Sequence, residues 1–587
     1  MTARTDFAAG PVDRGKLAEF WYGLRTGFGY SPAVIVLMAV MLGLMLPPII
    51  FLLNSSVHTV KADGSFDEFT LRFYKELITN PRFFNNLINT TVYAVGSAII
   101  AIILGTIQAW IVERTNTPLR RYVFLVSIIS LGIPSVLYTV AFLLLLGKNG
   151  PVNELLGVFF GTENGPILDV YTMWGMVIIE GIDFAPLVFL LLASVFRSAD
   201  ASFEEASMMS GAGISQTFSR ITIRLAAPGV FALLILIFIR AFESFETPAL
   251  VGRPGNIFVL TTDIYQAAQL DTPPNYGQAG AFSVALLLLV VVLLYWYNRL
   301  SRHAERFQTI TGKGFRPRVM DLGKWRYFTA AILVVMFIVI IVLPVSIVVW
   351  ASFLPYYQPF SLKALPLFTL DNFAEVLDAG LLLDSVSNTL ILGVSTATVV
   401  SLFTTVCAWL AVRRYKGGWM LDQLATMPLI LPSIVLGVAL LQVFLNTPFG
   451  LYGTLTSLVL ASMIRYLPYG MRYSYAGVLQ IHTELEEASA MSGARGPGTF
   501  IRIVVPLVAP ALITCWLFVF LSSTKAVSLM ILLIGPDSHI VAVTIFDLWE
   551  NGALPELAAL GVAWTAFMTV VSGFFYYIAR RYGLTVK

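Results

Sequence analysis

The sequence predicts an all-α membrane protein of about twelve transmembrane helices, arranged as two parallel six-helix repeats. Three observations predict this fold class: an apolar composition, a series of long apolar segments, and a polar segment that occurs twice. Residues 204–214 read EEASMMSGAGI, and residues 486–496 read EEASAMSGARG. Both copies lie between long apolar segments, which indicates that one membrane module has been duplicated and fused.

The composition indicates a membrane environment. Hydrophobic residues make up 57% of the 587 residues and charged residues 12%, whereas soluble domains contain about 45–50% and about 25%. The first apolar segment is long enough to span a bilayer, so we expect it to be retained as a helix and not cleaved as a signal peptide. Cys407 and Cys515 fall within apolar segments, which favours buried thiols over a disulfide framework or a metal site.

The apolar segments have the length of membrane spans. A helix needs about 20 mostly apolar residues to cross a bilayer. Six candidates in the first half lie near 33–54, 86–112, 122–147, 171–194, 227–245 and 276–298. Six candidates in the second half lie near 328–352, 385–411, 421–447, 455–480, 509–533 and 555–579.

The basic residues predict the orientation. With the N-terminus inside, most of the 37 Lys and Arg fall in predicted inner segments, which follows the positive-inside rule and places both termini in the cytoplasm. The net charge of +3 therefore reflects topology, and we expect no nucleic-acid partner. A basic linker, 299–326, separates a first half (1–315) from a second half (316–587).

The repeat extends beyond the duplicated segment. Ala109-Trp110 matches Ala408-Trp409 at an offset of 299 residues, whereas the duplicated segments match at an offset of 282. The second half is therefore shorter, and the outer loop 148–170 is the expected place of the difference. Because each half has six predicted spans, the halves should be related by an axis along the membrane normal.

The duplicated segment resembles the cytoplasmic EAA loop of importer-type ABC transporter permeases, the inner-membrane subunits of binding-protein-dependent uptake systems. The pattern of that family is Glu-Ala-Ala, three residues, Gly, nine residues, then Ile-x-Leu-Pro. The second copy matches it with Glu487, Ala488, Ser489, Gly493, Ile503, Val505 and Pro506, and the first copy with Glu205, Ala206, Ser207, Gly211, Ile221 and Ile223. The first copy departs at Arg224, where the pattern has Pro, and Pro228 lies just beyond.

The resemblance implies a type I importer permease whose loops, 203–224 and 485–506, dock on two copies of a cytoplasmic ATPase. The implied ATPase-coupling residues are Glu204, Glu205, Ala206, Gly211, Glu486, Glu487, Ala488 and Gly493, with Met208, Met209 and Met491 as adaptable apolar contacts. Acidic side chains suit the start of a short helix, and glycine would let the chain turn after it. The alternative is that the acids only cap a solvated loop.

The resemblance also implies a periplasmic substrate-binding protein as partner and a multi-pass location in the bacterial inner membrane, surrounded by lipid. No G-x-x-x-x-G-K-[ST] phosphate loop occurs in the sequence. ATP and Mg are therefore expected on the partner ATPase, with no cofactor and no enzymatic activity on this chain. Whether the chain offers metal ligands stays unknown at this point.

Charged residues within apolar segments are candidates for the translocation path, because charges inside a bilayer are costly and usually functional. At the offset of 282, Asp183 matches Arg465 and Glu243 matches Lys525. We predict that Asp183 and Arg465 form a structural or gating pair and that Glu243, Glu246 and Lys525 line the route. The alternatives are a purely structural pair and interfacial acids that face water.

The segments 242–252 and 258–265 resemble fused permeases assigned to ferric-iron uptake. Carboxylate oxygens suit a hard trivalent cation and suit protonated polyamines equally. The expected function is transfer of ferric iron from a periplasmic binding protein to the cytoplasm by alternating access. The alternatives are import of polyamine, thiamine or phosphonate by the same architecture and, in a different class, a gradient-driven secondary transporter, which would lack paired EAA loops.

Overall fold

The computed structural model describes residues 31–61, 63–161, 167–198, 202–304, 319–378 and 380–581. These residues are helical almost throughout, and their strands are one antiparallel hairpin, β1 (His58–Val60) and β2 (Phe66–Phe69). The predicted all-α fold class is therefore confirmed. Much of the predicted linker 299–326 lies outside the described residues.

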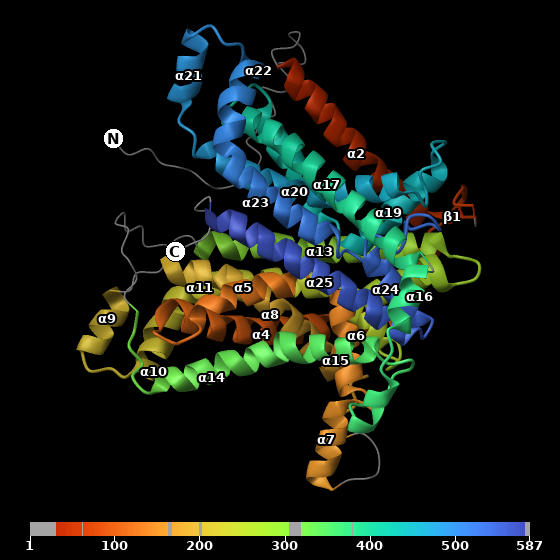
Figure 1. The fold of residues 1–587 in the computed structure, drawn as a ribbon. Coiled ribbons are helices and arrows are strands. Elements are labelled where there is room, and N and C mark those ends of the chain that lie inside the picture. The colour runs from red at the N-terminus through yellow and green to blue at the C-terminus, as the bar shows by residue number, and fades with distance from the viewer. Residues whose placement is uncertain are drawn as a thin grey trace. The chain divides into compact units, whose positions relative to one another are not determined.

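Ten helices in the described part of the chain are long and apolar enough to cross a membrane, or eleven if one bent pair is counted as one span. The uninterrupted ones are α2 (Pro32–Ser56), α4 (Pro81–Arg114), α8 (Met173–Ser198), α13 (Tyr276–Ala304), α17 (Leu381–Val412) and α25 (Leu554–Arg581). Three contain a π-helical turn: η1 (Phe218–Thr222) with α11 (Ile223–Phe242), η8 (Phe500–Val504) with α23 (Val505–Ser523), and α14 (Trp325–Phe337), η5 (Ile338–Val342) and α15 (Leu343–Ser352). The tenth candidate runs from Ser135 to Phe160. Figure 1 labels most of these helices.

Two predicted spans are not continuous helices. The segment 122–147 is divided into α5 (Arg120–Leu131) and α6 (Ser135–Leu146), and the segment 421–447 breaks before α19 (Ser433–Asn446). The breaks fall at Pro134 and Pro432, which lack the backbone N–H and restrict the residue before them. The second break is preceded by α18 (Gly418–Thr426) and the 3₁₀ turn η7 (Met427–Ile430). The predicted span 455–480 is helical, as α20 (Leu455–Leu479), but is not among the ten.

The extra residues of the first half lie in the loop 148–170, as predicted. They include α7 (Pro151–Phe160), whose Leu155, Val158 and Phe159 are exposed. The matching part of the second half is a short turn before α20. Other short elements between the long helices are α3 (Arg72–Thr79), α12 (Leu260–Tyr265), η2 (Pro248–Gly252), η3 (Gln266–Leu270), η6 (Leu362–Leu367), α16 (Asp371–Asp378) and α24 (Val541–Glu550).

The chain forms two compact units, each of which takes segments from both predicted halves. One unit comprises Met1–Phe51, Leu392–Leu431 and Val459–Ser523, and the other comprises Leu52–Ile391, Pro432–Leu458 and Thr524–Lys587. In the smaller unit Met41, Cys407 and Val508 belong to one buried core. In the larger unit α4, α8 and α11 pack together around a core that includes Val188 and Phe189. Both cysteines are buried and unbridged.

Candidate functional site

The two copies of the duplicated segment form matching short helices. The first copy is α9 (Ser202–Met209) and the second is α21 (Thr483–Met491). After each helix the chain turns at a glycine with positive φ, +84° at Gly211 and +83° at Gly493. Glycine adopts this left-handed region without the steric conflict of a Cβ atom. The predicted turn after each helix is therefore present in both copies.

After the glycine turn, both copies continue into a membrane helix by the same path. In the first half α10 (Ile214–Thr217) leads through η1 into α11, and in the second half α22 (Gly496–Thr499) leads through η8 into α23. A hydroxyl pair closes each loop, with Ser207 and Thr217 3.0 Å apart and Ser489 and Thr499 2.8 Å apart. Arg224, which replaces the expected Pro, lies inside α11. Its presence leaves the exit from the first loop unchanged.

In the first copy, Glu204 ties the short helix to a membrane helix. Its side chain is only 2% exposed. Arg114, the last residue of α4, places Nη1 3.6 Å from Glu204 Oε2. Thr222 donates a hydrogen bond of 2.7 Å to Glu204 Oε1. A buried carboxylate requires such partners, so α9 is fixed to the end of α4 and to η1.

The second copy repeats this attachment with different geometry. Arg413, directly after α17, makes an ion pair of 2.6 Å with Glu486 and also donates to the Ile481 carbonyl at 3.0 Å. Trp409 Nε1 donates to the same carboxylate at 3.0 Å. The side chain of Glu486 is 16% exposed. The second carboxylate is therefore more hydrated than the first and has an indole donor in place of a hydroxyl.

Each attachment includes an aromatic pair. The ring centroids of Trp110 and Phe218 are 4.7 Å apart, and those of Trp409 and Phe500 are 5.0 Å apart. We call Arg114, Glu204, Trp110 and Phe218 the first anchor, and we call their matched residues the second anchor. The matched residues are Arg413, Glu486, Trp409 and Phe500. The sequence matched these positions at two different offsets, 299 and 282, which concealed the contacts between them.

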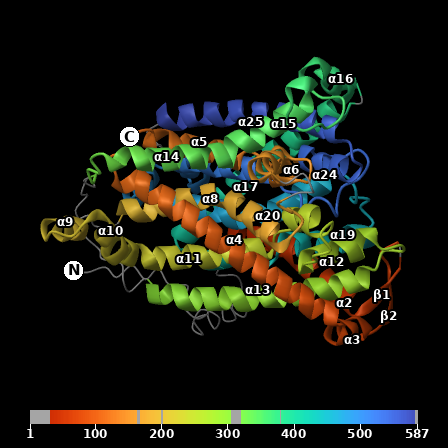
Figure 2. The ribbon, with the colours of Figure 1, turned by 90° about the horizontal axis from the view of Figure 1, so that it is seen from below.

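The outward faces of α9 and α21 carry the remaining candidates. Glu205 is half-buried and Glu487 is exposed. Met209 and Met491, which match at the offset of 282, are 90% and 89% exposed. Figure 2 shows α9 beyond the ends of α4 and α11. The first glutamate of each pair is thus used within the chain, whereas the second glutamate and a methionine are presented outward.

Within the larger unit, two candidates for the translocation path have polar partners from distant parts of the chain. Asp183 on α8 accepts a hydrogen bond of 3.0 Å from Ser135, at the start of α6. Glu246 accepts one of 2.8 Å from Ser528, its own match at the offset of 282. The two matched positions of the repeat therefore meet at Glu246 and Ser528.

Lys525 and Glu180 extend this polar group. Lys525 donates to the Leu131 carbonyl at 3.0 Å, next to the break between α5 and α6, and its charge interacts with those of Asp183 and Glu246. Glu180 is 3% exposed and accepts a hydrogen bond of 2.6 Å from Thr247. The sequence analysis missed Glu180, although it lies one helical turn before Asp183 in an apolar segment. No group of three residues suited to hold a metal ion occurs among the described residues.

The other two candidates have contacts of their own. Glu243 forms an ion pair of 3.1 Å with Arg240, and Arg465 donates to the Leu431 carbonyl at 2.9 Å. The pairing of Asp183 with Arg465 and that of Glu243 with Lys525 stay predictions.

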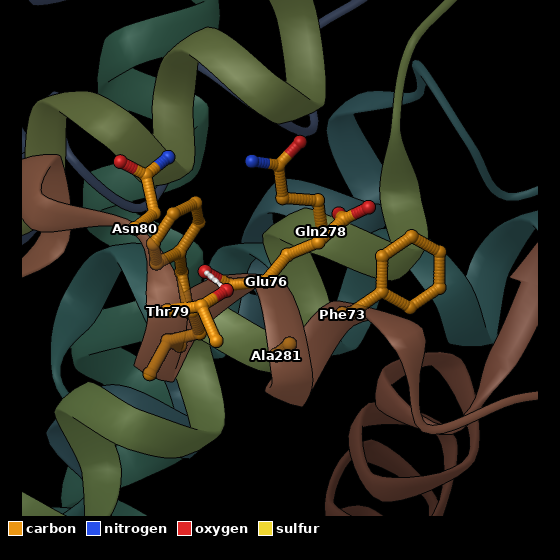
Figure 3. A pocket seen from close by; sticks show the side chains of 8 residues that line it. Phe73, Glu76, Thr79, Asn80, Gln278 and Ala281 are labelled. Carbon is orange, nitrogen blue, oxygen red and sulfur yellow. Dashed lines mark hydrogen bonds between the residues drawn. The ribbon is translucent and has the colours of Figure 1, made fainter.

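A cavity of about 260 Å³ lies between α3 and α13, where Phe73 and Glu76 face Gln278 (Figure 3). Its one carboxylate, Glu76, already pairs with Arg72 at 2.5 Å. This cavity therefore offers little to a cationic cargo.

Comparison with known protein families gives one family, which matches two separate parts of the chain. The family described as binding-protein-dependent transport system inner membrane component matches residues 101–306 and 401–583. The ferric transport system permease protein FbpB of Actinobacillus pleuropneumoniae is 27% identical over 77% of this chain, and the match spans 65% of the length of that relative. The Fe(3+)-transport system permease protein FbpB 2 of Haemophilus influenzae is 22% identical over 86% of this chain and 92% of its own length. The spermidine/putrescine transport system permease protein PotB of Salmonella typhimurium is 25% identical over 42% of this chain and 86% of its own length.

Proposed function

The chain belongs to the family of binding-protein-dependent transport system inner membrane components, and from this we propose that it is the fused permease subunit of an ATP-driven importer. The observation that carries the proposal is the pair of matching loops, each fixed to the end of a long membrane helix by an Arg–Glu ion pair. A solvated loop with capping acids would not need a buried ion pair in one copy and a three-donor carboxylate in the other.

The two loops are proposed to dock on two copies of a cytoplasmic ATPase. Glu205 and Glu487 would meet polar or basic groups of the ATPase, and the exposed Met209 and Met491 would fill an apolar groove, because methionine adapts to irregular surfaces. Movement of α9 would be passed to α4 through Glu204 and Arg114. ATP and Mg would be bound by the partner, both termini would be cytoplasmic, and a periplasmic binding protein would deliver the cargo on the opposite side.

The docking proposal is tested by the double variant Glu205→Lys with Glu487→Lys. It should insert normally but fail to co-purify with the ATPase, and uptake should be lost. The matched control is Glu68→Lys with Glu375→Lys, which makes the same change of charge at exposed positions on outer elements. Normal ATPase co-purification and uptake in the first variant would refute the docking role.

Ferric iron is the proposed cargo. Relatives that match over 77% and 86% of the chain are described as ferric transport permeases. The polar group within the larger unit offers the carboxylates of Glu180, which is buried, and of Asp183 and Glu246, which are half-buried. Hard oxygen ligands suit a trivalent cation. Their spacing does not form a metal-binding group, which suits a path because tight ligation would prevent release. A polyamine is the second candidate, because PotB is also a relative and carboxylates attract protonated amines.

Uptake of labelled ferric iron and labelled putrescine, in cells with and without this gene, separates the two cargoes. Expression of the ATPase and the binding protein is kept constant. Iron uptake that depends on the gene, and that falls in Glu246→Gln more than in Ser528→Ala, would support the iron assignment. Putrescine uptake that depends on the gene, without iron uptake, would overturn it. Uptake of either that survives loss of the ATPase but stops with an uncoupler would contradict the importer class.

A further inference from the structure

A second cavity, of about 360 Å³, lies between α5 and α14 within the larger unit. These two helices run side by side in Figure 2 and contact one another. Leu125 and Val126 of α5 and Leu333 and Phe337 of α14 line the cavity, with α4 and α8 behind them. Val334 at its edge is 39% exposed. The cavity is therefore apolar and can be reached from the surface of the helices that would face lipid.

The depth of this cavity corresponds to one leaflet of a bilayer. Its lining extends along α5 from Tyr122 to Ser130, a rise of about 12 Å at 1.5 Å per residue. The hydrocarbon core of a bilayer is about 30 Å thick, so one leaflet contributes about 15 Å. A lipid acyl chain that enters from the inner surface would fill the cavity without crossing the midplane.

A polar side chain without a partner lies on the wall of the cavity. Gln108 of α4 is 5% exposed, and its Oε1 accepts no hydrogen bond from the described residues. A buried amide oxygen without a donor is unfavourable. Gln108 lies six residues before the inner end of α4, about 9 Å along the helix. The donor for this oxygen therefore comes from outside the described residues.

Four cationic side chains lie where α5 and α14 begin: Arg120, Arg121, Lys324 and Arg326. The two helix starts are held together, because the Thr117 and Thr329 hydroxyls are 2.7 Å apart and the Asn116 N–H donates to the Met320 carbonyl at 3.1 Å. Arg326 is seven residues before Leu333, so the two share one face of α14. The charges therefore lie at the mouth of the cavity.

The neighbouring groups favour an anion at this mouth. Arg121 and Arg326 each lie over the ring of the following tyrosine, Tyr122 and Tyr327, as is usual at a membrane interface. Hydrogen bonds from the Gly323 N–H and the Asn116 amide hold the pKa of the Asp321 carboxyl below its usual range. Asp321 is thus engaged by Gly323 of its own loop and by Asn116, and the four cations exceed the acid present.

We propose that an anionic phospholipid, such as phosphatidylglycerol, binds here from the inner leaflet. One acyl chain would fill the cavity, and the phosphate would lie among the four cations. Because α5 belongs to the first predicted half and α14 to the second, the lipid bridges the two halves. The proposal does not depend on the cargo and goes beyond the proposed transport function.

The test measures thermal unfolding of the purified full chain in detergent with added phosphatidylglycerol or phosphatidylcholine. Phosphatidylglycerol should raise the midpoint and phosphatidylcholine should not. In Arg121→Gln with Arg326→Gln, half-saturation should need about thirtyfold more phosphatidylglycerol, since each basic residue near an anionic headgroup contributes about a factor of five. The control, Arg495→Gln with Arg502→Gln, removes two exposed charges from the smaller unit and should respond like the unmodified protein.

Two further measurements test the acyl chain separately. Val334→Trp should fill the cavity, so phosphatidylglycerol should no longer raise the unfolding midpoint. A cooperative unfolding transition of this variant without lipid would show that it folds. With the unmodified chain, a short-chain phosphatidylglycerol should give a much smaller shift than the full-length lipid. Equal shifts with phosphatidylcholine, with short-chain lipid or in the double Arg variant would overturn the proposal.

Discussion

The first and second anchors use the same four residues but stabilise their carboxylates in different ways. Glu204 is buried and depends on Arg114 and Thr222. Glu486 is partly hydrated and receives donors from Arg413 and Trp409. At the positions that match, Val504 replaces Thr222, and Trp110 Nε1 has no partner among the described residues. After duplication each carboxylate thus retained its cation, whereas the auxiliary donor differs between the copies.

The difference in burial predicts which loop is more sensitive to change. A buried carboxylate that loses its cation cannot be rehydrated, whereas one near the surface can recover much of its solvation. We therefore expect the first loop to be held rigidly and the second to tolerate substitution. Each variant below has a counterpart at the matched position of the other copy.

The largest effect is expected for Arg114→Met, which leaves Glu204 buried without its cation. Unfolding should become easier by about 3–5 kcal/mol, the usual result of breaking a buried pair. Arg413→Met should weaken the protein by about 1–3 kcal/mol, because Glu486 keeps the Trp409 donor and contact with water. Thermal unfolding of the purified proteins in one detergent gives both values.

A double variant checks that the lost cation is the cause. Arg114→Met with Glu204→Gln removes both charges and should recover part of the loss, as expected for residues in direct contact. Equal losses for Arg114→Met and Arg413→Met would contradict the difference between the anchors.

The next effect concerns the hydroxyl found only in the first anchor. Thr222→Val should cost about 1.5–3 kcal/mol, because it removes a hydrogen bond to a buried carboxylate. Thr222→Ser keeps the hydroxyl and should cost less. If Thr222→Val and Thr222→Ser unfold at the same temperature, the hydrogen bond from the hydroxyl contributes little to stability. The second copy, which has Val504 at this position, would then not need the Trp409 donor in place of a hydroxyl.

The repeat made much of this arrangement predictable. A constant offset located both loops, and the expected turn after each helix accounted for Gly211 and Gly493, which have positive φ in the structure. The sequence did not show which glutamate of each pair turns inward. Adjacent residues on a helix differ by about 100° in direction, and a helix as short as α9 has too few turns for periodicity to identify its buried face.

Two other features were missed for related reasons. Hydropathy averages over about 20 residues, so the breaks at Pro134 and Pro432 did not interrupt the predicted spans. Glu180 has no charged match in the second half, where Ser462 occupies its position, so a search for matched charges passed over it. Glu246, by contrast, was a candidate from the sequence, and its partner Ser528 is its own match in the second half.

A smaller effect is expected for the two tryptophans. Trp409→Phe removes an N–H donor from Glu486 but leaves Arg413 in place, so the loss should be about 1 kcal/mol. Trp110→Phe keeps a ring against Phe218 and removes an indole N–H without a partner in the described part of the chain, so it should be close to neutral. Comparison of the two unfolding midpoints measures the indole donor. A larger loss for Trp110→Phe would show that ring packing, and not the donor, dominates.

The smallest difference is expected where the two copies are alike. The hydroxyl pairs Ser207–Thr217 and Ser489–Thr499 have nearly equal lengths, 3.0 and 2.8 Å. Ser207→Ala and Ser489→Ala should each cost about 0.5–1.5 kcal/mol, the usual net value of a neutral hydrogen bond, with no difference between them in unfolding experiments. If Ser207→Ala were clearly worse, the first loop would be more sensitive throughout its length, and burial of Glu204 alone would not account for the contrast between the anchors.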